Sequence, residues 1–287
     1  MAPVRIVTDS THCLPAELLA RHDFGVVSLY VNEAGTTTRE SELTDLDAFY
    51  ARLRSAADLP TTSQPSLGDF LAVYEPMLDA GHDIVSVHIT AGMSGTVATA
   101  RQAAAEANAT HPGRRVEVID SASTGGGLAM VVLSAQAAAT RGADVDAVVA
   151  QAEEARATAR IWFAVDTLEY LRRGGRIGAA QALLGSALKI KPILTVQGEV
   201  VPIERVRTSG RAFERLVEFG RELVESGADA FMIQHIQAHE RAASLASRVS
   251  ELFGHGPIYI SEVGPVVGAH TGPGLLGVGG LPARLLS

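Results

Sequence analysis

Short apolar runs rich in β-branched residues alternate with longer stretches of helical periodicity in the first half of the chain. This pattern predicts strands at residues 4–7, 24–31, 83–89 and 115–119. Between them, a Ser-x-x-Asp sequence that resembles a capping box precedes apolar residues at helical spacing and predicts a helix over 67–80. Strands that alternate with helices are typical of βαβ units, so we expect an α/β fold with a mainly parallel N-terminal sheet.

The pattern changes near residue 160, after a polar, alanine-rich helix expected at 144–159. The second half is expected to form a strand at 161–165, a hairpin of 193–196 with 200–206, helices at 210–226 and 238–253, and strands at 230–235 and 257–260. The change of pattern indicates a domain boundary. We therefore predict two α/β domains, an N-terminal domain over residues 1–160 and a C-terminal domain over residues 161–287.

Two long stretches without charge could be mistaken for membrane spans, and both have the wrong composition. Residues 121–140 begin with Ser, Thr and Gly and predict a loop followed by a buried, alanine-rich helix. Residues 263–283 are rich in Gly and Pro, which disfavour a helix. We expect this second stretch to be a loop of defined shape and expect no transmembrane segment.

The composition is that of an ordinary folded protein, with 287 residues of which 47% are hydrophobic and 20% are charged. A net charge of −8 without a long basic block argues against a nucleic-acid partner. The start of the chain has no basic segment followed by an apolar one, so no secretory signal is predicted. We expect a cytoplasmic protein.

Cysteine and histidine residues give no metal-binding pattern. Cys13 is the only cysteine, and His235, His239 and His255 have no partners at ligand spacing in the sequence. The P-loop motif of nucleotide-binding proteins is absent as well. We therefore expect neither a metal ion nor another cofactor.

Ser94 is the first candidate for ligand binding, because ligands of α/β sheets collect where strands end and helices begin. Gly92 and Gly95 flank this position and would allow a ligand close to the backbone. The Ser94 hydroxyl could bind an anion, or it could only cap the helix that follows. The two interpretations can both hold, since a helix N-terminus favours negative charge.

Three further positions carry suitable side chains. Thr62 and Ser63 could contact a ligand, or they could simply begin the helix predicted near residue 67. His270 lies in the Gly/Pro-rich stretch, which would fix the direction of its ring. A purely structural hydrogen bond from that ring is the alternative.

A compact basic turn contains Arg172, Arg173 and Arg176, and guanidinium groups suit carboxylates and phosphates. Lys189 and Lys191 could extend this basic patch. The alternative for all five residues is that they are solvated surface charges.

An enzymatic alternative uses Ser94 as nucleophile and His270 as base, in a serine esterase or acyl transferase. The third member of such a triad would be an aspartate such as Asp9 or Asp120. The sequence around Ser94 is not the G-x-S-x-G motif of α/β hydrolases, so the arrangement would be unusual. A regulator that senses a lipid and binds another protein is a third interpretation.

Seven segments, in register over nearly the whole chain, resemble the DegV family of bacterial fatty-acid-binding proteins. They are Val7-Thr-Asp-Ser10, Thr61-Thr-Ser-Gln-Pro-Ser66, Met93-Ser-Gly-Thr96, Ile119-Asp-Ser121, Leu171-Arg-Arg-Gly-Gly-Arg-Ile177, Leu188-Lys-Ile-Lys-Pro-Ile193 and Gly264-Pro-Val-Val-Gly-Ala-His-Thr-Gly-Pro-Gly274. The resemblance implies two α/β domains with a long-chain fatty acid in an apolar tunnel between them.

The resemblance also implies roles for individual residues. Thr62 and Ser94 would hold the carboxylate of the fatty acid, and His270 would lie close to it, with Ser63 and Gly95 in support. The chain would have no catalytic residues of its own. It would present the fatty acid to a separate ATP-dependent fatty acid kinase, which makes an acyl phosphate for phospholipid synthesis.

In the same resemblance, the motif arginines Arg172, Arg173 and Arg176 would help to dock the kinase or stabilise the phosphoryl group. Physical estimates agree with a carrier: burying about 14 methylenes gains on the order of 11 kcal/mol before ordering costs. The head group then needs only hydroxyls, backbone N–H donors and a helix dipole. We therefore expect no strong cation beside the carboxylate.

Overall fold

The computed structural model describes residues 2–184 and 190–287. Its first sheet is parallel throughout, in the order β2 (Gly25–Val27), β1 (Val4–Asp9), β6 (Asp83–His88) and β7 (Val116–Asp120). The predicted parallel N-terminal sheet and three of its four strands are therefore confirmed.

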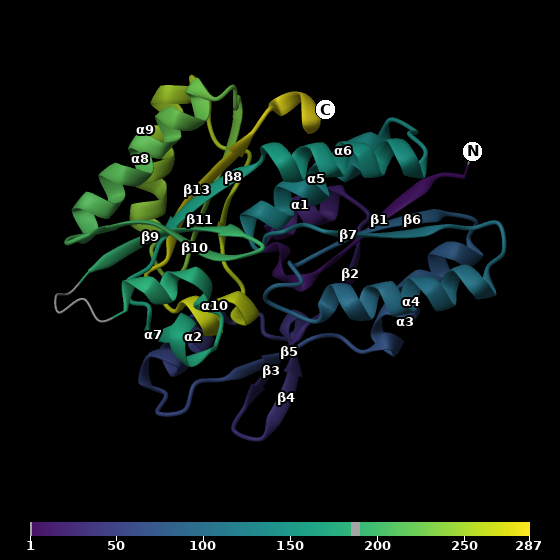
Figure 1. The fold of residues 1–287 in the computed structure, drawn as a ribbon, viewed down its shortest axis with the longest axis horizontal. Helices are drawn as coiled ribbons and strands as arrows, with labels where there is room; N and C mark the ends of the chain where they lie inside the picture. Colours follow the sequence, from purple (N-terminus) through teal and green to yellow (C-terminus); the bar gives the residue numbers. More distant parts are fainter. Residues whose placement is uncertain (1, 185–189) are drawn as a thin grey trace.

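Helices cover both faces of this sheet (Figure 1). One face carries α3 (Leu67–Asp79) and α4 (Thr96–Thr110), and the other carries α5 (Gly126–Thr140) and α6 (Val145–Thr158). The capping box predicted for α3 is present, with Ser66 and Asp69 each accepting a hydrogen bond from the other's backbone N–H. The loop and buried helix predicted over 121–140 are confirmed, and α1 (Ala16–Arg21) precedes β2.

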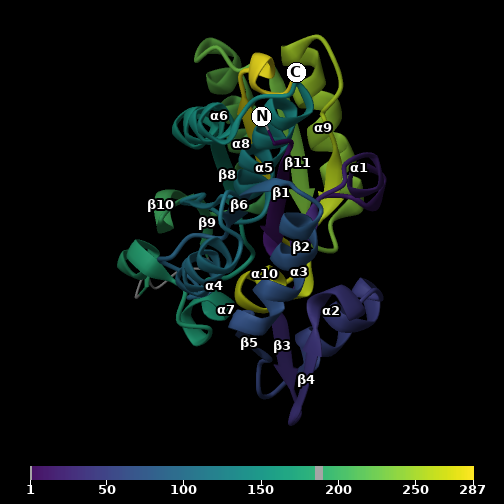
Figure 2. The same ribbon diagram turned by 90° about the vertical axis from the view of Figure 1, so that its right-hand side faces the viewer.

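The single strand predicted at 24–31 is wrong. The chain leaves the first sheet after β2 and forms β3 (Tyr30–Glu33) in a separate antiparallel sheet of order β4 (Thr36–Arg39), β3, β5 (Thr61–Ser63). The break lies at Leu29, whose N–H donates to the Ser10 hydroxyl instead of to a neighbouring strand. Together with α2 (Leu46–Ser55), this small sheet forms the lower end of the molecule in Figure 2.

The second large sheet is mostly antiparallel and comes from the other half of the chain. Its order is β10 (Glu199–Val206), β9 (Lys191–Gln197), β8 (Arg160–Ala164), β13 (Leu276–Leu281), β11 (Ala230–His235) and β12 (Ile260–Glu262). Helices α8 (Ser209–Glu225) and α9 (His239–Phe253) pack on one face. The predicted hairpin and both helices are confirmed, whereas β12 begins three residues later than predicted. The preceding residues already contact β11, since Ile258 N donates to Phe231 O at 2.7 Å.

The prediction of a loop over 263–283 is wrong. This stretch forms α10 (Pro265–Thr271) and the central strand β13. Pro265 is the first residue of α10, where the missing N–H costs nothing. In β13, a Cβ at Gly279 would lie 2.8 Å from the Met232 side chain, so glycine allows the close packing of this strand.

Helix α5 joins the two halves of the molecule. It packs against β1 and β6 of the first sheet and against β13, β8 and β11 of the second (Figure 1). Met130 of α5 belongs to one core cluster with Ile6 of β1 and Met232 of β11. The predicted boundary between residues 160 and 161 falls at the start of β8, and the division into two domains stays a prediction. No helix in the described part of the chain is long and apolar enough to span a membrane.

Candidate functional site

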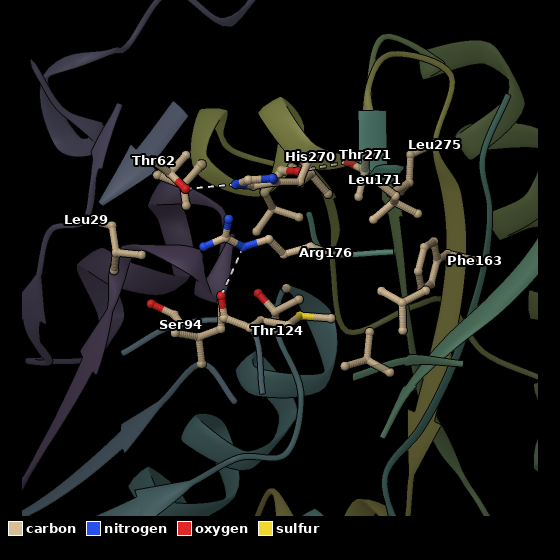
Figure 3. Close-up of a pocket in the computed structure, with 18 of the residues that line it drawn as sticks. Leu29, Thr62, Ser94, Thr124, Phe163, Leu171, Arg176, His270, Thr271 and Leu275 are labelled. Carbon is tan, nitrogen blue, oxygen red and sulfur yellow. Dashed lines mark hydrogen bonds between the residues drawn. The ribbon is translucent and has the colours of Figure 1, made fainter. Parts of the chain in front are cut away.

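A cavity of about 300 Å³ lies where the first sheet, the second sheet and the small sheet meet. This volume is at the lower end of the range for small-molecule sites. Figure 3 shows Thr62, Ser94 and the Arg176 guanidinium toward one end of the cavity, the polar end, beside Leu29, and Phe163, Leu171 and Leu275 toward the other, beside Thr271. The apolar walls are formed by Leu29, Ile89, Met93, Ile161, Phe163, Leu171, Val196, Val200, Val263, Val266, Val267 and Leu275.

Thr62 and His270 meet at the polar end. Thr62 is the middle residue of β5, and His270 lies near the end of α10, which packs against β5. Thr62 Oγ1 and His270 Nε2 are joined by a hydrogen bond of 2.8 Å (Figure 3). His270 is therefore fixed by a helix, not by the loop that the sequence predicted. Ser63 also lines the cavity.

Burial foremost, and then the nearby charge of Arg176, lower the pKa of His270 to about 4. The imidazole is therefore neutral near pH 7. Its Nδ1 is buried and has no hydrogen-bond partner in the described part of the chain. The ring therefore bonds to Thr62 through Nε2. No carboxylate of the described residues accepts a hydrogen bond from Nδ1, so nothing increases the basicity of the imidazole.

Ser94 lies in the loop between β6 and α4 and also lines the cavity. Its Oγ lies 2.8 Å from Thr96 Oγ1 and accepts a hydrogen bond from Thr96 N at 3.3 Å. The hydroxyl therefore stands at the first turn of α4 and faces the cavity. Gly95, and not Ser94, is the N-cap residue of α4, so the prediction that Ser94 caps the helix is wrong by one position. The prediction that Ser94 contacts a ligand agrees with its place on the cavity wall and stays a prediction.

Gly95 supports the site because it has no side chain. A Cβ at this position would overlap the side-chain amide of Gln64. Gln64 Nε2 donates to Thr99 Oγ1 at 2.8 Å, which ties the end of β5 to α4. Glycine at position 95 therefore lets the strand that carries Thr62 approach the helix that follows Ser94.

Of the three motif arginines, Arg176 alone lines the cavity. Its Nε donates to Met93 O at 3.2 Å and its Nη1 to Gly174 O at 2.9 Å. Figure 3 shows the guanidinium between Thr62 and Ser94. The expectation that no strong cation stands at the polar end is therefore wrong.

The other predicted basic residues that the structure describes lie outside the cavity. In α7 (Glu169–Arg173), Arg172 pairs with Glu169, and Arg173 Nη2 donates to Ala57 O at 2.7 Å. Lys191 Nζ pairs with Asp166 at 2.6 Å, and Lys189 lies outside the described residues. Their proposed role in docking a partner stays a prediction.

The polar end does not assemble the triad that an esterase would need. His270 bonds to Thr62, Ser94 bonds to Thr96, and neither aspartate considered from the sequence is a partner of His270. Asp120 instead accepts hydrogen bonds from the N–H groups of Ala91 and Ala122. The geometry gives no support to the enzymatic alternative.

A Ser–His–Asp chain does exist elsewhere, between β1 and β6. Asp9 Oδ2 lies 3.0 Å from His88 Nδ1, and His88 Nε2 lies 2.6 Å from Ser86 Oγ, which accepts a hydrogen bond from Tyr74. All three members of this chain are fully buried and none lines the cavity. Burial alone would raise the pKa of Asp9, but its hydrogen bonds, that from His88 foremost, lower it overall. We interpret this chain as a structural link between the two strands.

Several cavity residues were not identified as candidates from the sequence. Thr124 and Gln234 place polar atoms on the wall, and Phe163 and Leu171 form part of the apolar end. Thr124 follows β7 in a Ser/Thr/Gly loop, so the rule that ligands collect beyond strand ends could have identified it. The sequence gives no such signal for the apolar residues, because apolar residues that line a cavity have the same sequence pattern as those that fill a hydrophobic core.

An apolar cavity with hydroxyls, an imidazole and one guanidinium at a single end defines the class of this protein. It is an α/β protein whose cavity has the chemistry to accommodate an amphipathic small molecule with an anionic polar group.

Comparison with known proteins gives the family. The family model described as uncharacterised proteins of the DegV family matches residues 3–283. A DegV domain-containing protein of Streptomyces coelicolor is 40% identical over 278 residues, which cover 96% of this chain and 97% of that protein. This chain belongs to the DegV family.

Two solved structures are similar over almost their whole length. A structure described as fatty acid binding of a DegV family protein from Thermus thermophilus has a TM-score of 0.88 and 36% identity, covering 98% of this chain and 99% of that one. DegV of Bacillus subtilis, described as a fatty acid binding protein, has a TM-score of 0.87 and 32% identity, covering 98% and 100%. The resemblance and the α/β fold expected from the sequence are confirmed.

Proposed function

We propose that this protein binds a long-chain fatty acid, with the acyl chain in the apolar part of the cavity and the carboxylate at the polar end. The observation that carries this proposal is the convergence of Thr62, Ser94, His270 and Arg176 toward one end of a cavity whose walls are mostly apolar. The two solved relatives described as fatty-acid binding support it.

The polar end suits a carboxylate better than a neutral group. A carboxylate accepts hydrogen bonds only, so hydroxyls and a guanidinium satisfy it. Ser94 lies directly before the N-terminus of α4, and a helix N-terminus favours negative charge. The apolar walls gain roughly 0.8 kcal/mol for each methylene that they bury.

The first test is mass spectrometry of the protein purified from bacteria, native and then denatured. A noncovalent mass of a few hundred daltons that is released on denaturation as free fatty acid is the expected result. A mass that stays on the chain after denaturation and maps to Ser94 would favour the acyl-enzyme alternative instead.

Affinity for the head group is tested by comparing palmitate with methyl palmitate. The two probes share the acyl chain, but the ester has no negative charge. We expect palmitate to bind at least tenfold more tightly, because a hydrogen bond to a charged group contributes about 1.5–3 kcal/mol. Equal affinities would contradict the assignment of the polar end.

We further propose that the bound acid is presented, in the cytoplasm, to a separate ATP-dependent fatty acid kinase that forms an acyl phosphate for phospholipid synthesis. Phosphoryl transfer needs ATP, Mg²⁺ and a cradle for the γ-phosphate, and the partner would supply them. The γ-phosphoryl group of ATP would pass to a carboxylate oxygen, leaving ADP.

In this proposal the protein is a binding subunit and not an enzyme on its own. The test mixes the loaded protein with such a kinase and ATP, and traps any acyl phosphate with hydroxylamine as the acyl hydroxamate. Product that requires both proteins is expected. The lipid-sensing regulator would bind the same fatty acid and give no hydroxamate.

A further inference from the structure

A second cluster of ligating side chains lies on the face of the second sheet opposite the cavity. It consists of His235, His239 and Glu262, whose ligand atoms all lie within 4.8 Å of one another. The sequence-based prediction considered only the spacing of histidines along the chain and did not include Glu262 as a partner of His235 and His239. The partner was hidden because Glu262 is 27 residues away from His235 in the sequence.

The fold explains why these residues meet. His235 is the last residue of β11 and Glu262 the last residue of β12, and the two are paired in register in parallel strands. Paired residues project to the same face of a sheet. His239 is the first residue of α9, which begins directly beyond these strand ends.

Alternation along β11 separates this cluster from the fatty-acid site. Gln234 lines the cavity, so the next residue, His235, projects to the opposite face. His239 is exposed, whereas His235 is 4% exposed. The cluster thus has one buried member and one member that is open to solvent.

One feature of the cluster points to a ligand. The Nδ1 atom of His235 is buried and has no hydrogen-bond partner in the described part of the chain, which is costly for a ring nitrogen. The His235 and His239 rings lie 4.5 Å apart, between centroids, at an angle of 58°, so they are not stacked. An ion between them would satisfy both rings.

Glu262 is oriented as a metal ligand usually is. Its Oε1 accepts hydrogen bonds from Gln237 N at 2.8 Å and Gln237 Nε2 at 3.2 Å. Its Oε2 faces His239 Nε2 at 3.6 Å. One carboxylate oxygen is therefore held by a second layer of contacts, as around known metal sites, while the other points into the cluster.

Gln237 is itself fixed. It adopts a φ of 52° in the left-handed region, and its Nε2 also donates to Asp47 Oδ1 at 2.6 Å. Because a non-glycine residue rarely adopts this conformation, the turn between His235 and His239 is held by its contacts.

We propose that His235, His239 and Glu262 form a binding site for a divalent transition-metal ion, of which zinc is the best candidate. Two imidazoles and one carboxylate suit zinc, whereas magnesium and calcium prefer oxygen ligands alone. Neighbouring ligands of tetrahedral zinc lie roughly 3.3 Å apart. The exposed His239 ring can close the remaining gap by rotation. The ion would tie the ends of β11 and β12 to the start of α9.

The test uses the full chain without a histidine tag, stripped with EDTA, and titrates Zn²⁺ against a chromophoric chelator at pH 7.5. One equivalent is expected to bind, and His239→Ala is expected to weaken binding at least tenfold. Since His239 is exposed, this variant should fold normally, which circular dichroism checks. His255→Ala is the matched control, because His255 bonds only to the backbone carbonyls of Gly256 and Asp229.

Glu262→Gln is the second variant, since its amide oxygen can still accept the Gln237 hydrogen bonds while the negative charge is lost. It should also weaken zinc binding, and zinc should raise the Tm of the wild type but not of His239→Ala. Absence of stoichiometric binding to the wild type would overturn the proposal. So would equal affinity in His239→Ala, or an equal loss in His255→Ala.

Discussion

At the scale of single residues, the polar end of the cavity separates two kinds of contribution. The hydroxyls of Thr62 and Ser94 are uncharged donors, whereas Arg176 is a cation. A hydroxyl would give the carboxylate one hydrogen bond, worth about 1.5–3 kcal/mol because the acceptor is charged, whereas a guanidinium can give two parallel hydrogen bonds together with an opposite charge. Substitutions can therefore distinguish the two contributions by magnitude.

Thr62→Val removes the hydroxyl and keeps the shape of the side chain. We expect the Kd for palmitate to rise by about tenfold, because the carboxylate loses a donor and His270 loses its partner. Thr62→Ser should keep most of the affinity. Thr61→Val is the control, because Thr61 lies in the same strand and does not line the cavity. Calorimetric titration measures all four proteins, and unchanged affinity in Thr62→Val would refute the assignment.

Arg176→Gln should reduce the preference of the site for an anion. We expect palmitate affinity to fall by about 10–100-fold while methyl palmitate affinity changes little, since the ester makes no charged contact. Arg176 also holds Met93 O and Gly174 O, so the ester serves as the check that the cavity is intact. Arg172→Gln is the matched control, because Arg172 pairs with Glu169 outside the cavity. A parallel loss for both probes would indicate a structural role only.

The neutral state of His270 predicts how stability changes with pH. The pKa of His270 is about 4 in the folded protein, owing first to burial, against about 6.5 in an unfolded chain. Between these values the unfolded state binds more protons, so this group makes the free energy of unfolding fall by about 1.4 kcal/mol per pH unit as pH decreases. In His270→Asn, the free energy of unfolding measured by urea titration should therefore depend less on pH than in the wild type. An unchanged pH dependence of the free energy of unfolding in His270→Asn would contradict this contribution.

At the scale of elements, α10 is the piece of structure on which the site depends. It carries His270 and is held at its start by contacts from the N-terminal half: Glu40 Oε1 accepts a hydrogen bond from Val266 N, and Tyr50 OH donates to Val263 O. Burial raises the pKa of Glu40 to about 7. The helix is short, with seven residues, so its position depends on these contacts and not on its own stability.

Tyr50→Phe should therefore destabilise the protein by about 1–3 kcal/mol, because a buried carbonyl loses its partner. Hydrogen exchange over 265–271 should quicken in the same variant. Tyr259→Phe is the matched control: the Tyr259 hydroxyl is buried without a partner among the described residues, so its removal should cost nothing. Urea titration gives both free energies. If the two substitutions had the same effect, the contact of Tyr50 with the start of α10 would not matter.

Many helices and strands could be predicted from the sequence, and the predictions that failed did so for a physical reason. Periodicity predicted α3, α8 and α9 because each buries one face along its own length. The prediction of one strand over 24–31 failed because a run of apolar residues does not show that its two ends join different sheets. The prediction for 263–283 failed because how strongly Gly and Pro disfavour a helix or strand depends on their position. Here Pro265 begins a helix, where proline is tolerated, and the glycines of β13 allow close packing against neighbouring side chains. The direction of Arg176 depends on contacts with Met93, more than eighty residues away, and no local pattern contains it.

At the scale of the whole molecule, the core shared around α5 leads us to expect that the two halves unfold as one cooperative unit. Trp162, the only tryptophan, lies in the second sheet and stacks on Phe219 with 4.1 Å between ring centroids. Its fluorescence therefore reports on the C-terminal half, while far-UV circular dichroism reports on the whole chain. We expect both signals to show one coincident urea transition.

Ile6→Ala tests this coupling, because Ile6 is fully buried in the first sheet, within the shared core. The substitution should cost about 2–5 kcal/mol and move the Trp162 transition as far as the dichroism transition. Two separate transitions, or a Trp162 signal that does not respond, would show that the halves unfold independently.

Ligand binding should extend this coupling, because both halves line the cavity. Val263 and Phe163 come from the second half, and Thr62 and Ser94 come from the first. A ligand that binds only the folded state adds about 2.7 kcal/mol to stability at a free concentration of 100 Kd. Palmitate should therefore shift the fluorescence and dichroism transitions of the delipidated protein together and equally. The double variant Thr62→Val/Ser94→Ala should need a higher palmitate concentration for the same shift. A shift confined to one signal would mean that the acid is held by one half alone.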